Sequence, residues 1–165
     1  MKGSDVCVRK AGPDDAALVK QLIEELNQHQ GEPTGHVTEA AVRRDAFGQA
    51  PEFIVLLAEL DGVVAGYALY HPTWSTEVGE PGLYIYDLYV REDARGHGVG
   101  RALMASVAAA AKAEGRGFLW WCSKPWNREA QAFYAGLGAI EEDIKAHAVF
   151  GEAFDRLAAA GEGRR

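Results

Sequence analysis

Three glycines at alternate positions, Gly96, Gly98 and Gly100, lie between Arg95 and Arg101, where an aromatic strand pattern gives way to an alanine-rich helical pattern. The first amides of a helix have no intrahelical acceptors and carry the positive end of the helix dipole. Glycines allow a phosphate to approach such amides closely. The segment therefore predicts a phosphate-binding turn to which the arginines add charge. A purely structural glycine turn is the alternative.

Two common nucleotide-binding motifs do not fit this spacing. The Walker motif requires Gly-Lys-Ser/Thr, whereas the chain has Gly100-Arg101-Ala102. The dinucleotide fingerprint requires Gly-x-Gly-x-x-Gly and an acidic residue at the end of the next strand, whereas the next predicted strand ends at Cys122-Ser123.

A second motif, WNREAQAFYAGLGA at residues 126–139, follows the next predicted strand. Together with RGHGVG at residues 95–100 it resembles the GNAT superfamily of acyl-CoA-dependent N-acetyltransferases. The words YHPTW at 70–74 and LYIYDLYV at 83–90 are similar to those of its diamine, polyamine and thialysine acetyltransferases. The resemblance implies transfer of an acetyl group from acetyl-CoA, as co-substrate, to a primary amine of a small molecule, without a metal.

The resemblance also assigns the coenzyme-binding residues. The turn amides hold the diphosphate. The strand before the turn splays at a bulge and pairs with the pantetheine arm, and the Val90 amide polarises the acetyl carbonyl. The implied residues are Leu88, Tyr89, Val90, Arg95, Gly96, His97, Gly98, Val99, Gly100, Arg101, Asn127, Arg128, Glu129, Ala130 and Tyr134.

Three side chains are candidates for proton transfer. Tyr134 lies at the family's general-acid position, and a phenol can reprotonate a thiolate at neutral pH; simple packing is the alternative. Asp87 is a carboxylate in an apolar strand, which either binds the acceptor and takes its proton or is held in a structural hydrogen bond. His71, expected on a loop, is a second candidate base or is merely solvated. Besides these two candidate bases, deprotonation of the amine by water is a third route to the reactive neutral amine.

Further residues are candidates for acceptor binding. Polyamine acetyltransferases often carry two adjacent acids in the strand that contains Asp87, and here Tyr86 replaces the first of them. Trp74 and Trp126 are candidates to line the acceptor site through cation–π contacts, with packing as the alternative.

Hydrophobic patterning predicts the elements that position these residues. Strands are expected over 6–9, 53–60, 63–70, 83–90 and 118–122, with a loop over 71–81 and a weaker pair of strands within 140–150. Helices are expected after Asp14 or Asp15, after Thr38, and over about 98–114, 128–137 and 152–160. The order β-α-α-β-β-β-α-β-α-β-β defines an α/β (α+β) fold. The resemblance implies a mixed, mostly antiparallel, twisted sheet with helices on both faces.

Composition limits the possible partners. The 165 residues, 48% of them apolar, suit a single domain over 1–165, and a net charge of −7 disfavours nucleic acid but suits a cationic small molecule. No run is apolar enough to cross a membrane, and the first residues lack a secretion signal, which predicts a cytoplasmic protein. The five histidines lack ligand spacing, so no metal site is expected. Cys7 and Cys122 are expected to be reduced and interior.

Two other functions remain open, and the resemblance implies a homodimer. A protein or peptide N-acetyltransferase would need an open groove for its acceptor. A non-catalytic acyl-CoA sensor would keep the glycine turn without proton transfer.

Overall fold

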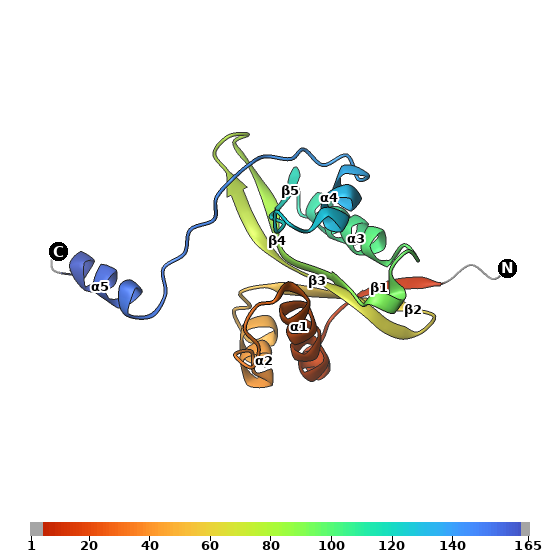
Figure 1. Ribbon diagram of the computed structural model, residues 1–165, viewed down its shortest axis with the longest axis horizontal. Coiled ribbons are helices and arrows are strands. Elements are labelled where there is room, and N and C mark those ends of the chain that lie inside the picture. Colours follow the sequence, from red (N-terminus) through yellow and green to blue (C-terminus); the bar gives the residue numbers. More distant parts are fainter. Residues whose placement is uncertain (1–4, 163–165) are drawn as a thin grey trace. The chain divides into compact units, whose positions relative to one another are not determined.

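The computed structural model describes residues 5–162 and contains two compact units, one that ends at Pro125 and one that begins at Trp126 (Figure 1). The first unit holds a five-stranded sheet with three α-helices. Its elements are β1 (Val6–Lys10), α1 (Ala16–Gln30), α2 (Glu39–Phe47), β2 (Ile54–Leu60), β3 (Val63–Ser75), β4 (Glu80–Val90), α3 (Val99–Ala113) and β5 (Phe118–Trp121), with 3₁₀ turns at Pro13–Asp15 and Glu92–Ala94. The second unit contains α4 (Arg128–Ala135) and α5 (Gly151–Glu162).

The sheet has the order β1-β2-β3-β4-β5, and all neighbours are antiparallel except β4 and β5, which are parallel. The predicted Asp61-Gly62 turn joins β2 to β3, with both residues at positive φ (52° and 82°). Gly66 is required where β3 approaches β4, because a Cβ there would lie 2.3 Å from the Tyr89 carbonyl oxygen. The mixed, mostly antiparallel sheet that the resemblance implied is confirmed.

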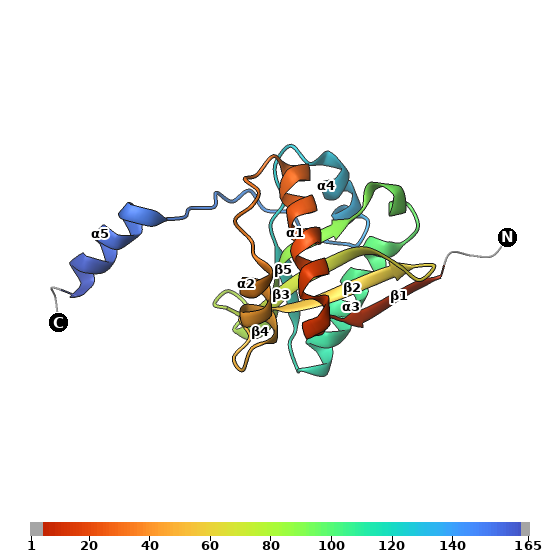
Figure 2. The ribbon, with the colours of Figure 1, turned by 90° about the horizontal axis from the view of Figure 1, so that it is seen from below.

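Helices cover both faces of this sheet. α1 and α2 pack on one face and α3 packs on the other (Figures 1 and 2). Under α1 and α2 the core includes Leu22, Leu26, Leu57 and Tyr67, all buried. Burial of each such side chain contributes about 1.5–3 kcal/mol. This packing makes the middle of β3 and β4 a rigid support for the side chains that they carry.

Two helix starts agree with the sequence prediction. The Thr38 hydroxyl accepts a hydrogen bond from the Ala41 amide at 3.1 Å and caps α2. α3 begins at Val99, with Gly98 as its N-cap in the left-handed conformation. The glycine turn therefore leads directly into the long helix.

The expected loop over 71–81 is wrong. β3 and β4 form a longer hairpin in which His71 pairs with Tyr84 and Ser75 pairs with Glu80. Pro72 made a strand look unfavourable in the sequence, because proline has no amide hydrogen to donate to a neighbouring strand. In the structure, however, the β2–β3 ladder ends at the pair Ile54 and Tyr70. Pro72 therefore has no β2 neighbour to which it fails to donate a hydrogen bond.

The expected pair of strands within 140–150 is also wrong. In the described chain, residues 139–150 form no strand, and Ile140 and Phe150 are 92% and 81% exposed. A strand pattern needs a neighbouring backbone to satisfy its amides and carbonyls, and this segment pairs with none among residues 5–162. Cys7 and Cys122 are free but exposed, so the expectation that they are interior is wrong as well. No helix in residues 5–162 has both the length and the apolar character to span a membrane.

Candidate functional site

A β-bulge in β4 sets the geometry of the candidate acceptor site. Leu69 pairs with Asp87 but the next residue, Tyr70, pairs with Ile85, so Tyr86 is an extra residue in β4. A bulge turns neighbouring side chains away from the regular alternation of a strand. As a result, Tyr86 and Asp87 both line the same cavity.

This cavity, which we call the acceptor cavity, has a volume of about 350 Å³. α1, α2, β3, β4, the segment between α1 and α2, and the residue before β2 contribute its walls. The lining residues are Ile23, His36, Val37, Ala41, Val42, Asp45, Phe53, Leu69, Tyr86 and Asp87. Apolar walls with carboxylates among them suit an amine carried on an aliphatic chain.

Asp87 is the most deeply placed charged group of the acceptor cavity. Its Oδ2 accepts a hydrogen bond from the Tyr67 hydroxyl at 2.9 Å. Burial raises the pKa of the Asp87 carboxyl, and the bond from Tyr67 partly opposes this effect because it stabilises the ionised form. Asp87 is thus a better proton acceptor than an exposed carboxylate. Sequence reasoning singled out Asp87 but missed Tyr67, whose apolar neighbours in β3 gave no sign of a polar contact.

His71 lies in β3, not on a loop, and belongs to an aromatic cluster beside the acceptor cavity. Its ring centroid lies 5.0 Å from that of Tyr86 and 5.5 Å from that of Tyr84. Its Nδ1 is 2.7 Å from the Pro72 carbonyl oxygen, which can only accept, so Nδ1 carries the proton in this contact. The His71 ring therefore packs against the Tyr86 ring, and His71 does not itself line the acceptor cavity.

Trp74 is not brought to the acceptor cavity. It pairs with Pro81 towards the tip of the β3–β4 hairpin and is 60% exposed. Its indole therefore has no part in the lining of this cavity.

The other edge of β4 offers backbone groups to an extended ligand. The parallel ladder between β4 and β5 ends at the pair Ile85 and Trp121, whereas β4 continues to Val90. Within residues 5–162, no strand pairs with Leu88, Tyr89 and Val90 on that side. The Arg95 Nε donates to the Val90 carbonyl oxygen at 3.2 Å and fixes the end of the strand. This edge fits a pantetheine arm that binds as an added strand.

The glycine turn has a backbone conformation that residues other than glycine rarely adopt. Gly96 and Gly98 have φ angles of 79° and 85°, and a Cβ added at either would meet no atom within 4 Å. Backbone conformation rather than packing therefore demands glycine there, and the space beside the turn is open. The first intrahelical bond of α3 runs from the Ala102 amide to the Gly98 carbonyl at 2.9 Å. The amides of Val99 and Gly100 precede it and point out of the helix end.

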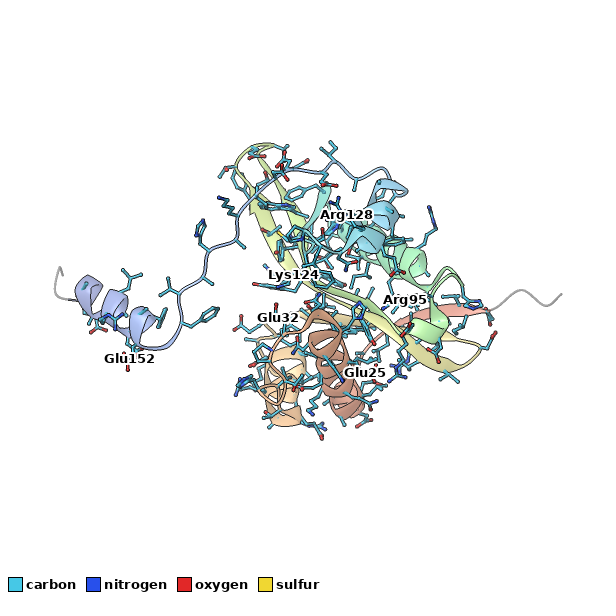
Figure 3. The ribbon with its side chains drawn as sticks, viewed as in Figure 1. Glu25, Glu32, Arg95, Lys124, Arg128 and Glu152 are labelled. Carbon is cyan, nitrogen blue, oxygen red and sulfur yellow. The ribbon has the colours of Figure 1, made fainter. Side chains whose placement is uncertain are left out.

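Two ion pairs in the first unit hold the surroundings of the site. The Glu25 carboxylate on α1 accepts two bonds from the Arg91 guanidinium after β4, at 2.8 and 2.9 Å. Glu32, after α1, pairs with Lys124, after β5 (Figure 3). The first ion pair attaches α1 to the segment that follows β4. The second attaches the segment after α1 to the segment that follows β5.

The remaining predicted residues lie in the second unit. Asn127 caps α4, since its Oδ1 accepts from the Ala130 amide at 3.1 Å, and Trp126 before it is 54% exposed. The first turn of α4 contains the other predicted residues, Arg128, Glu129 and Ala130. Burial raises the pKa of the Tyr134 phenol, which therefore keeps its proton at neutral pH.

Comparisons with known proteins agree with this architecture. Residues 17–139 match the Acetyltransferase (GNAT) family. The chain is 32% identical over 143 residues to thialysine N-epsilon-acetyltransferase from Bos taurus, with 81% of this chain and 84% of the relative covered. It is 29% identical over 151 residues to aminoglycoside N(6')-acetyltransferase type 1 from Stenotrophomonas maltophilia, with 90% and 84% covered.

A solved structure supports the fold. An integron cassette protein from the mobile metagenome of V. cholerae superposes with a TM-score of 0.77 at 22% identity, with 93% of this chain and 97% of that chain covered. The family match and these relatives show that the chain is an enzyme that transfers acetyl groups. The chain belongs to the GNAT family of acetyltransferases, whose members use acetyl-CoA as co-substrate.

Proposed function

We propose that this chain transfers the acetyl group of acetyl-CoA to a primary amine of a small molecule, such as a diamine, a polyamine or a lysine-like compound. The acceptor cavity carries this proposal, because its mostly apolar lining includes the partly buried Asp87 carboxylate. The relatives, which are named as thialysine and aminoglycoside acetyltransferases, support a small-molecule amine as the acceptor.

Asp87 binds the acceptor and takes its proton in this proposal. The incoming ammonium group pairs with the carboxylate, which desolvates both charges inside an apolar cavity. The N–H bond breaks as the proton moves to a carboxylate oxygen, and the nitrogen lone pair becomes available. The raised pKa of Asp87 favours this transfer. Tyr86 replaces a second acid, so Asp87 is the one carboxylate that the bulge presents.

In this proposal, backbone groups of the glycine turn and β4 bind the co-substrate, together with residues at and near α4. Acetyl-CoA supplies an activated thioester carbonyl, so the mechanism needs no side-chain nucleophile. The amides of the glycine turn bind its diphosphate, and the edge of Leu88, Tyr89 and Val90 binds its arm. Asn127 contributes its side-chain amide. The amine lone pair attacks the thioester carbonyl, the C–S bond breaks, and the Tyr134 hydroxyl gives its proton to the leaving thiolate. The acetylated nitrogen loses its second proton to the Tyr134 phenolate, which restores the phenol.

A panel assay tests this function. The purified chain is mixed with acetyl-CoA and with diamines, lysine analogues, aminoglycosides or peptides, and the acetylated product is measured by mass spectrometry. Product detection is preferred to a thiol reagent because the exposed Cys7 and Cys122 would react with such a reagent. Rapid acetylation of small primary amines is the expected result. Acetylation of peptides alone, or bound coenzyme without turnover of any amine, would instead establish the peptide acetyltransferase or the sensor.

We propose in addition that the two units form one acetyltransferase domain that acts as a cytoplasmic homodimer. The family match continues from the first unit into the second as far as residue 139, and free cysteines suit a reducing compartment. Exposed apolar side chains in the second unit, including Ile140, Phe150 and Leu157, support an interface between copies. Light scattering tests the dimer, with Phe150→Ser expected to shift the mass towards the monomer; a monomeric wild-type chain would contradict it.

A further inference from the structure

We infer that Tyr67 is a positioning residue for Asp87: its hydroxyl holds one carboxylate oxygen and directs the other towards the acceptor amine. The inference rests on the proposed function for the role of Asp87. The Tyr67–Asp87 contact itself is independent of that function, because it is a hydrogen bond of 2.9 Å within the first unit.

The position of Tyr67 follows from the register of β3 and β4. Tyr67 pairs with Tyr89, and Leu69 pairs with Asp87, so Tyr67 and Asp87 are diagonal neighbours on the same face of the sheet. A diagonal pair lies within reach of an aromatic side chain. Tyr67 is 0% exposed, and the edge of its ring meets Tyr89 at a centroid distance of 6.3 Å. The core thus fixes the ring, and the ring fixes the hydroxyl.

The two carboxylate oxygens of Asp87 have different surroundings. Oδ2 receives the bond from Tyr67, whereas Oδ1 makes no hydrogen bond with any described residue. Asp87 also lines the acceptor cavity. Because the two oxygens share one rigid plane, the bond to Oδ2 determines where Oδ1 points. Oδ1 is therefore the atom that receives the acceptor's proton.

Tyr67 cannot lose its own proton in this contact. Burial and the adjacent Asp87 charge raise the pKa of the phenol far above its ordinary value. The hydroxyl thus keeps its proton and remains a donor at neutral pH. A permanent donor favours the ionised carboxylate, so Tyr67 limits the rise in pKa that burial imposes on Asp87. Without it, Asp87 would be protonated at a higher pH and unable to accept a proton.

Other titratable groups face this pair from the surrounding elements. None of them has a hydrogen bond to Asp87 in the described chain, so Tyr67 is the direct polar partner of its carboxylate. They are Glu25 on α1 with its partner Arg91, His36 before α2, Asp45 on α2, and Tyr86 and Tyr89 on β4.

The test compares Tyr67→Phe with Tyr70→Phe. The control removes a hydroxyl from another buried tyrosine of β3, which has no hydrogen bond to Asp87 among the described residues. We measure kcat/KM for an active amine against pH and, independently, the Asp87 pKa by ¹³C NMR of the side-chain carboxyl. In Tyr67→Phe we expect both the acid limb and the carboxyl pKa to move up by about one pH unit, with no movement in Tyr70→Phe.

The outcomes separate this inference from the proposed function. An unchanged carboxyl pKa in folded Tyr67→Phe would overturn the inference. If the carboxyl pKa rises but the acid limb stays, the contact is as described and the proposed catalytic role of Asp87 fails. If Tyr67→Phe does not fold, the wild-type chain with ¹³Cζ-labelled tyrosine supplies the answer. The Tyr67 resonance must then titrate together with the Asp87 carboxyl, and a resonance that stays constant would overturn the inference.

Discussion

Gly98→Ala separates the ligand-binding role of the glycine turn from its structural role. Gly98 is the N-cap of α3 at φ 85°, a conformation that costs alanine about 1–2 kcal/mol. A methyl group there would meet no atom of the described residues within 4 Å apart from its chain neighbours, so this strain is the main structural penalty. For a chain of this size, the loss should lower Tm by about 2–8 °C.

Coenzyme binding should fall much further than this strain alone requires. To relieve the strain, the backbone rotates the peptide that carries the Val99 amide, and the added methyl enters the open space beside the turn. Loss of one amide donor to a charged diphosphate costs about 1.5–3 kcal/mol. We therefore expect the Kd for coenzyme A to rise by about tenfold to a hundredfold in isothermal titration calorimetry.

Gly115→Ala is the matched control. Gly115 follows the other end of α3 at φ 71°, and its added methyl would also meet no atom within 4 Å. This variant should lose as much stability as Gly98→Ala but bind coenzyme A within about twofold of wild type. If both variants lose stability equally and both keep wild-type affinity, the turn amides do not bind the diphosphate and the reasoning is refuted. Equal loss of affinity in both would assign the effect to general destabilisation.

Three further substitutions test separate parts of the account. Asp87→Asn should lower kcat/KM for the amine by about a hundredfold or more while calorimetry shows unchanged coenzyme affinity; unchanged turnover would exclude Asp87 as the base. Tyr134→Phe should lower kcat by about a hundredfold with little change in coenzyme affinity, and a full kcat would exclude Tyr134 as the acid. Glu25→Gln should destabilise the chain by about 1 kcal/mol in urea unfolding at neutral pH. The Arg91 guanidinium lowers the pKa of the Glu25 carboxyl, so this contribution is present above the ordinary pKa of 4.5 and is lost as pH falls through the lower folded-state pKa. A difference between Glu25→Gln and wild type that persists at about pH 3 would contradict this assignment.

Local signals made the fold and the glycine turn predictable. The Thr38 cap and the start of α3 depend on residues within one turn of the chain, where capping and positive φ leave a clear pattern. The Asp61-Gly62 hairpin is local in the same sense. Asp87 was detectable because a charged side chain inside an aromatic strand is unusual.

Features that depend on register were not predictable. The resemblance implies a bulge in this strand, but its position at Tyr86 depends on the pairing of β3 with β4, which no local pattern marks. The Tyr67–Asp87 bond joins residues 20 positions apart, which the strand pattern alone cannot place side by side. Pro72 and Pro81 made the long β3–β4 hairpin look like a loop in the sequence. The structure tolerates Pro72 because the β2–β3 ladder has already ended at Tyr70. Residues 140–150 have the composition of strands but no pairing partner in the described chain.

The most direct test of the central claim is an amide NMR titration of the ¹⁵N-labelled chain with coenzyme A. Glycine amides are well separated in such spectra, and the chain offers Gly62 and Gly79 as glycines at positive φ outside the site. The account predicts that the amides of Gly96, Gly98 and Gly100 move most and reach saturation together, while those of Gly62 and Gly79 stay in place. Saturable coenzyme binding that leaves the three turn amides unmoved would contradict it.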